Sequence, residues 1–345
     1  MKKLWLVLLY LVAAAADAAP TAPVPLIDFA RTDTYDSPSL SPDGKYLALR
    51  FFNGQDYDIS IVELGAGKKP FRFAMGAGAS VHEYAWASST RLVFSLAENF
   101  GADAAPSPTG EIYAIDVDGK RGNYLFGFRG EGVKTGTRIG RNTRENAYGE
   151  LIRTLPDDPD HVLIAYYNWD ALIKDREVAI AARIHTVSGK RDQEVSAPIP
   201  GRVWFTADRS GFVRYVVGTN REGKQETYVR TPEAPKWRLL GSIQRDRVVG
   251  DEDSEFGDAE LSADGRFAYR VSNELTGRNC LLLQDIDSGQ IQPLSCDEQF
   301  DAAGIVRSPI DNEPVAVLYE GGIPRLDILK TDNRGAAIVR GMQKE

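Results

Sequence analysis

From Ser39 to Leu49 the chain reads SLSPDGKYLAL, and a looser copy, ELSADGRFAY, runs from Glu260 to Tyr269. In both copies Asp-Gly supplies turn residues that tolerate a positive φ, and alternating apolar residues follow the turn. Each copy therefore predicts a β-strand, a tight turn and a second strand. Weaker relatives of this unit fill the interval at a spacing of about 50 residues, which is typical of the blades of a β-propeller.

Each propeller blade is a four-stranded meander, so every unit should contain one turn between its first two strands and another between its last two. We place the first turn of the six units near Gly44, Thr90, Pro159, Gly211, Gly265 and Asn312. The second turns fall at residues 65–68, 118–120, 188–190, 232–235, 287–289 and 332–335. The sequence thus predicts an all-β propeller of about six four-stranded blades over residues 37–345. Whether six blades close the ring, or whether it is an incomplete seven-bladed ring, stays open.

The N-terminus predicts export. Lys2 and Lys3 precede an apolar run from Leu4 to Ala16, and Ala16-Asp17-Ala18 is a small-residue cleavage pattern. We expect a signal peptide over residues 1–18, an N-terminal segment over residues 19–36, and a periplasmic or secreted mature protein; a retained membrane anchor is the alternative. No later apolar run is long enough to span a membrane. The net charge of −8 argues against nucleic acid as a partner.

The two cysteines flank a predicted turn. Cys280 and Cys296 lie at equal distances from Ser288, so a hairpin centred on that residue places them opposite one another. In an oxidising compartment we expect them to form a structural disulfide rather than a redox-active pair, since no Cys-x-x-Cys spacing is present.

Two stretches rich in Gly, Pro, Thr, Asn and Arg, Asn99–Glu111 and Gly127–Gly149, interrupt the repeat and are predicted to be extended loops near one mouth of the propeller. Arginines of the second stretch are candidates for contacts with a peptide or a partner, although surface solubility explains them equally well. These candidates are Arg129, Arg138, Arg141 and Arg144.

No motif predicts a catalytic, cofactor or metal site. Gly78-Ala79-Ser80-Val81-His82 comes nearest to the nucleophile elbow of serine hydrolases but lacks its closing glycine. The three histidines lie in different contexts with no ligand spacing between them. Asp116–Gly119 lacks the distal glutamate of a calcium loop, and the acidic run Asp251–Glu255 is predicted to be a solvated loop.

With the blades placed, the mature chain resembles the N-terminal propeller of prolyl-oligopeptidase-type serine peptidases, in particular exported bacterial dipeptidyl-aminopeptidases and acylaminoacyl-peptidases. The residues that carry the resemblance are Ile27–Arg31, Leu40–Gly44, Gly110–Gly119, Leu155–Ile164 and Gly211–Arg214. In that family a further blade and an α/β-hydrolase domain follow and carry the Ser, Asp and His of the active site, and the propeller filters peptides by size. This chain stops at Glu345, where the sixth unit ends, so no catalytic residue has a matching position.

The resemblance implies a non-catalytic, exported propeller without a cofactor that binds a peptide or a protein. One alternative is a truncated or split peptidase whose hydrolase domain is encoded separately and acts as its partner. Another is a scaffold of the envelope similar to TolB, because periplasmic TolB-like propellers share the Ser-Pro-Asp-Gly turn.

Overall fold

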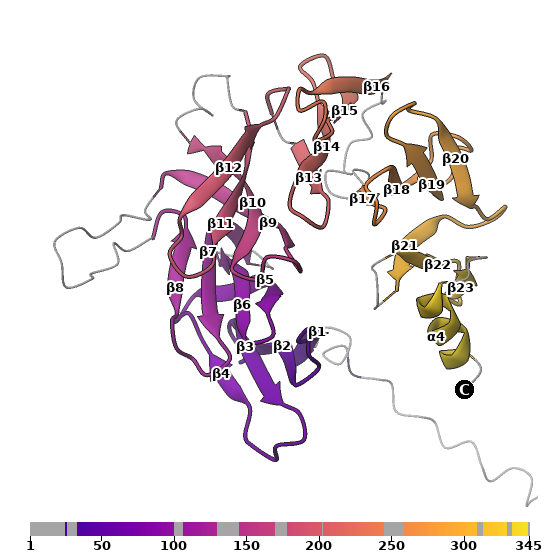
Figure 1. Cartoon of the computed structure of the whole chain (residues 1–345). Coiled ribbons are helices and arrows are strands. Elements are labelled where there is room, and N and C mark those ends of the chain that lie inside the picture. Colours follow the sequence, from indigo (N-terminus) through magenta and orange to yellow (C-terminus); the bar gives the residue numbers. More distant parts are fainter. Residues whose placement is uncertain are drawn as a thin grey trace, which may run out of the picture.

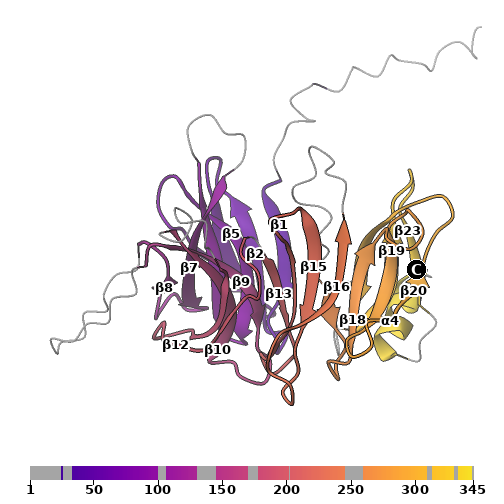
Figure 2. The same ribbon diagram turned by 90° about the horizontal axis from the view of Figure 1, so that it is seen from above.

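The computed structural model describes residues 25, 33–99, 106–129, 145–169, 178–201, 203–244, 259–308, 313–329 and 333–343. These residues form six antiparallel sheets arranged around a common centre as the blades of a β-propeller (Figure 1). The view from above shows the sheets standing side by side, each turned relative to the next (Figure 2). The predicted all-β fold and the six blades are confirmed.

In each of the first five blades the four strands pair in chain order. The strands of the first two blades are β1 (Tyr35–Leu40), β2 (Tyr46–Phe52), β3 (Tyr57–Glu63), β4 (Phe71–Phe73), β5 (Ala79–Ser88), β6 (Arg91–Glu98), β7 (Ser107–Asp116) and β8 (Asn123–Phe126). Those of the third and fourth are β9 (Ala147–Thr154), β10 (His161–Asn168), β11 (Ile180–His185), β12 (Arg191–Ser196), β13 (Val203–Ala207), β14 (Val213–Thr219), β15 (Lys224–Val229) and β16 (Arg238–Gln244).

The last two blades comprise β17 (Glu260–Leu261), β18 (Phe267–Ser272), β19 (Cys280–Asp285), β20 (Ile291–Ser295), β21 (Ala302–Arg307), β22 (Pro314–Tyr319) and β23 (Arg325–Ile328). The sixth blade departs from the expected four strands, because helix α4 (Arg334–Met342) follows β23 in place of a last strand. Asn333 caps this helix by accepting a hydrogen bond from the Gly335 amide. Within the part of the chain that the structure describes, no helix has the length and apolarity needed to cross a membrane.

The repeated Asp-Gly turns have the same geometry in the first and fifth blades. Ser41 donates a hydrogen bond to Asp43, whose carboxylate also accepts from the Lys45 amide. Ser262 and Asp264 repeat this arrangement. Gly44 and Gly265 have φ values of +69° and +68°, which L-residues rarely adopt. The sequence repeat is therefore a repeat of one hydrogen-bonded turn that joins the innermost strand to the next.

The hydrophobic core is divided among the junctions between blades. Five buried clusters are present in the described residues, and each one joins a pair of consecutive blades. The junction between the first and second blades, for example, is filled by Ile59 and Ile61 of β3 and by Leu92 and Phe94 of β6. Stability therefore depends on face-to-face packing of neighbouring sheets.

An arginine also crosses each of these five junctions. In each case the guanidinium of one blade donates to a backbone carbonyl of the next blade or of the segment that leads into it. At the junction between the second and third blades this bond is buried, so it satisfies an acceptor that packing removes from water. The pairs are Arg50 with His82, Arg91 with Thr186, Arg153 with Ala207, Arg238 with Ile286, and Arg278 with Gln299.

The predicted disulfide is confirmed. Cys280 and Cys296 are bonded across the β19–β20 hairpin with their Cα atoms 4.6 Å apart. The pairs nearest the turn, from Leu282–Pro293 to Gln284–Ile291, are centred between Asp287 and Ser288. A register shift then centres the outer Leu281–Ser295 pair, next to the two cysteines, on Ser288.

We expect the substitution Arg91→Met to lower the free energy of unfolding by about 3 kcal/mol, because it removes a buried partner of Asp116 and the bond to the third blade. The side chain of Arg91 is 4% exposed, whereas that of Arg121, which pairs with the same carboxylate, is 58% exposed. Arg121→Met is thus a matched control that should cost less than about 1 kcal/mol. Urea unfolding measures both, and equal losses would contradict the role given to the buried junction.

Replacing both cysteines by alanine should lower the free energy of unfolding by about 3 kcal/mol, because the bridge restricts the unfolded chain. The double variant should unfold identically with and without a thiol reductant, whereas the unchanged protein should lose stability when it is reduced. A reductant effect of the same size on both proteins would exclude this contribution from the disulfide.

Candidate functional site

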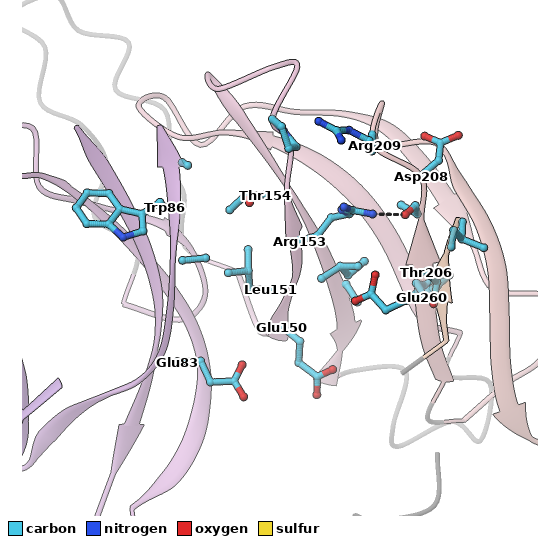
Figure 3. Close-up of a pocket in the computed structure, with 18 of the residues that line it drawn as sticks. Glu83, Trp86, Glu150, Leu151, Arg153, Thr154, Thr206, Asp208, Arg209 and Glu260 are labelled. Carbon is cyan, nitrogen blue, oxygen red and sulfur yellow. Dashed lines mark hydrogen bonds between the residues drawn. The ribbon is translucent and has the colours of Figure 1, made fainter. Parts of the chain in front are cut away.

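A cavity of about 1280 Å³ lies at the centre of the propeller. Its walls come from the innermost strands of consecutive blades, β5, β9, β13 and β17, and from the turns that follow them (Figure 3). Because each of these strands begins a blade, residues far apart in the sequence meet here. The lining combines acidic, basic and aromatic side chains, a composition that can orient a polar ligand.

Two carboxylates lie on one side of the cavity. Glu83 of β5 and Glu150 of β9 come from adjacent blades and lie near one another in the close-up (Figure 3). The side chain of Trp86 lies on the same strand as Glu83, is 8% exposed, and donates its indole N–H to the carbonyl of Ser39. This hydrogen bond fixes the indole between the first two blades, so the wall behind Glu83 is firmly packed.

Arg153 lies on the opposite side of the cavity, with Glu260 and Asp208 around it (Figure 3). Its Nη1 donates to the carbonyl of Ala207 at 2.5 Å, while its buried Nε has no hydrogen-bond partner among the described residues. Burial lowers the pKa of Arg153, although the charges of Glu260 and Asp208 act in the opposite direction. The group is therefore a cation built into the cavity wall, with its Nε shielded from solvent.

Asp208 is held in the turn between β13 and β14. Its carboxylate accepts hydrogen bonds from Ser210 and from Arg214, the latter at 2.7 Å. Burial alone would raise the pKa of Asp208, but these hydrogen bonds together outweigh it and keep the pKa below its usual 3.8. Asp208 thus stays negative near Arg153, and its carboxylate oxygens already accept hydrogen bonds from Ser210 and Arg214.

Of the arginines proposed from the sequence, Arg129 is described, and it is engaged within its own blade. Its guanidinium forms ion pairs with Glu98 and Glu111, and Glu111 is 2% exposed. Arg138, Arg141 and Arg144 lie outside the described residues, as do the predicted signal peptide at residues 1–18 and the acidic run at 251–255. The predicted partner contacts of these arginines stay a prediction.

The other residues considered as possible catalytic or metal-binding groups make contacts within the fold. Ser80 is 1% exposed and accepts a hydrogen bond from the Tyr57 amide. His161 and His185 face each other across β10 and β11 with ring centroids 5.0 Å apart. Asp116 pairs with arginines. Among the described residues no three His, Cys, Asp or Glu side chains are grouped so that they could hold a metal ion.

The acidic residues that line the cavity were not among the candidates predicted from the sequence. Glu83, Glu150 and Glu260 occupy the inward edge of their blades. Glu83 and Glu150 belong to no recognisable motif, and Glu260 opens the second copy of the Asp-Gly repeat, which predicts a turn and not a binding site. The one available signal was their position a few residues before the first turn of a unit, within the strand that lies next to the propeller axis.

No family model and no curated protein sequence matches the chain. Solved structures match it in fold. An oligogalacturonate lyase in complex with manganese has a TM-score of 0.50 and 12% identity, over 86% of this chain and 77% of the lyase. A prolyl endopeptidase has a TM-score of 0.52 and 11% identity, over 88% of this chain and 42% of the endopeptidase. TolB from Acinetobacter baumannii has a TM-score of 0.42 and 12% identity, over 91% of this chain and 73% of TolB.

These identities show a shared propeller fold and nothing finer. The similarity to the propeller of a prolyl endopeptidase agrees with the resemblance found in the sequence. The chain spans less than half the length of that endopeptidase chain, so the activity of the whole enzyme is not transferred to it.

The substitution Asp208→Asn should lower the free energy of unfolding by about 1–2 kcal/mol at pH 7, because the charged form is the one that Ser210 and Arg214 stabilise. A carboxylate with a lowered pKa stabilises the fold above its unfolded pKa and loses that contribution as the pH falls through its folded value. The difference between the variant and the unchanged protein should therefore shrink below about pH 4, as measured by urea unfolding across the pH range.

Asp118→Asn is the control for this substitution, since Asp118 also caps a turn through the Lys120 amide but is more exposed. It should change stability less than Asp208→Asn does. A loss for Asp208→Asn that is the same at pH 3 and pH 7 would contradict a contribution from the charge.

Proposed function

We propose that this chain is an exported, non-catalytic β-propeller that binds a peptide or an extended protein segment in its central cavity. The observation that carries the proposal is the cavity itself, whose polar lining comes from the innermost strands of successive blades. Sites built on strands hold their side chains in fixed positions, which suits recognition.

The size of the cavity favours an extended ligand. Small-molecule pockets usually occupy about 300–1,000 Å³, whereas this cavity measures about 1280 Å³. A peptide of a few residues fits such a space better than a single small molecule, because its backbone supplies both donors and acceptors along its length. The lining offers carboxylate oxygens on one side and the positive charge of Arg153 on the other.

The charges of the lining favour a peptide that carries a positive group. Glu83 is exposed at the cavity wall, and its carboxylate has no described cationic partner. Arg153 instead has two acidic neighbours, Glu260 and Asp208. The carboxylates outnumber the cations, so a lysine or arginine side chain or a free amino group should gain from entering.

The position of Ser80 supports the proposal that the chain is not itself a peptidase. A serine nucleophile must be accessible and hydrogen-bonded to a base, whereas Ser80 is buried and its hydroxyl is used by the Tyr57 amide. The disulfide between Cys280 and Cys296 supports export, because such bonds persist in oxidising compartments.

A second function is favoured by the length of the match to the prolyl endopeptidase. The chain matches 42% of that protein, a share that leaves room for a catalytic domain. In this alternative the chain is the propeller of a peptidase whose hydrolase domain is supplied separately. A third candidate is a scaffold role similar to that of TolB. Stable capture of an envelope protein would distinguish it from the peptide-binding propeller and from the peptidase propeller.

Peptide binding can be tested by fluorescence anisotropy with labelled decapeptides of matched length, one rich in lysine and one rich in glutamate. The lysine-rich peptide should bind at least about tenfold more tightly, and Glu83→Gln should weaken it about threefold to tenfold through loss of one charged contact. Glu222→Gln is the control, because Glu222 is an exposed carboxylate paired with Lys224 away from the cavity. The same preparation should release no labelled product.

Equal affinity for the two peptides, or an equal effect of Glu83→Gln and Glu222→Gln, would contradict binding in the cavity. Peptide cleavage that a serine-directed inhibitor abolishes would contradict the non-catalytic assignment while leaving the binding site intact.

A further inference from the structure

One apolar face of the first blade is not covered by another blade. Each of the five buried clusters joins consecutive blades, and in the described residues none of them joins the sixth blade to the first. Figure 1 shows β1 and helix α4 apart from one another at the two ends of the row of blades. One sheet face of the first blade therefore lacks the neighbour that every other junction provides.

Strand register defines this open face. Tyr35 pairs with Phe51 and Leu40 pairs with Leu47, which places the four side chains on the side away from the second blade. The opposite side carries Ala48, which is fully buried in the cluster shared with the second blade. On the open side Tyr35 is 50% exposed and Leu40 is 57% exposed.

Part of the open face is covered by the first blade itself. The guanidinium of Arg72 lies 3.7 Å from the centre of the Phe51 ring and donates to the hydroxyl of Tyr35. Among the described residues, no such contact covers Leu40. The uncovered apolar surface is therefore centred on Leu40, with the half-buried Leu47 beside it.

Helix α4 presents a matching surface. Its first turn packs on the sixth blade, where Ala336 is fully buried and Gly335 lies against Ser308 so closely that an added Cβ would approach the backbone of Ser308 to 2.8 Å. Ile338 and Met342 lie one helical turn apart on another side of the helix, and they are 43% and 73% exposed. The helix is thus apolar on a side that faces no described partner.

We propose that the open face of the first blade around Leu40 is a docking surface for Ile338 and Met342 of helix α4 in the same molecule. The docked helix closes the propeller as a wedge between the sixth blade and the first. The inference concerns the ring and does not rest on the peptide-binding function.

Continuity with the established junctions favours this occupant. In all five, one apolar sheet face meets the apolar surface of the next unit along the chain. The helix takes the place of a final strand on the sixth blade, so it is the next unit at the sixth junction. Both surfaces belong to the same stack of blades, so their contact does not depend on protein concentration, whereas contact with a second copy does.

Cross-linking tests the proposal. In the variant Leu40→Cys with Met342→Cys, both new thiols replace exposed side chains, and the native cysteines are already bonded. Mild oxidation at micromolar protein should give a monomeric species with the Leu40–Met342 bridge, identified by mass spectrometry of peptides. A bridge requires the two Cα atoms to approach within about 7 Å.

The matched control pairs Leu40→Cys with Leu239→Cys, because Leu239 is 48% exposed but belongs to the fourth blade. The test pair should form the intramolecular bridge at least tenfold faster than the control pair, and Leu40→Cys with Ile338→Cys should do the same. Circular dichroism and retention of the native Cys280–Cys296 bridge confirm folding of each variant. Dimeric cross-links alone would assign the face to a second copy and overturn the proposal, as would rates no higher than the control.

Discussion

The structure depends on the packing of each sheet face against the next blade, with an arginine crossing the same junction to a backbone carbonyl. Apolar burial holds the faces together, and the guanidinium adds a directional hydrogen bond between blades. Arg91 shows the arrangement most fully, because it joins Asp116 of its own blade to Thr186 of the next. A meander sheet alone has two faces to cover, so stability arises only when blades are stacked.

This constraint also produces the site. Because the outer parts of the blades are held by the junctions, the innermost strands can carry polar side chains that contribute little to packing. Glu83 and Glu150 are brought together in this way from two blades, and Arg153 serves both purposes, since it bridges to Ala207 and also lines the cavity. The cavity is therefore a consequence of the radial arrangement, and its chemistry can vary without loss of the fold.

The turns and the disulfide could be predicted from the sequence because both depend on local geometry: Asp43-Gly44 needs a positive φ, and Cys280 and Cys296 are symmetric about one turn. The stretch 99–111 was predicted to be a loop, yet β7 begins at Ser107, because pairing with β6 overrides the weak strand preference of Pro108 and Gly110. Helix α4 was not predicted, because residues 332–335 have the composition of the other predicted turns. The contact with Ser308 that holds the helix forms only when the sixth blade has folded. The cavity residues were not predictable, since strands next to the axis meet only after the blades are stacked.

Hydrogen exchange measured blade by blade tests most directly whether the junctions hold the fold. The second to fifth blades have a buried core on both faces, whereas the first has a core on one face and, with the helix docked, only Ile338 and Met342 over the other. Amides of β6, β10 and β14 should therefore exchange only through global unfolding, and those of β2 should exchange faster through opening of the first blade. Equal protection of β2 and the central strands, or slower exchange in β2, would contradict the account.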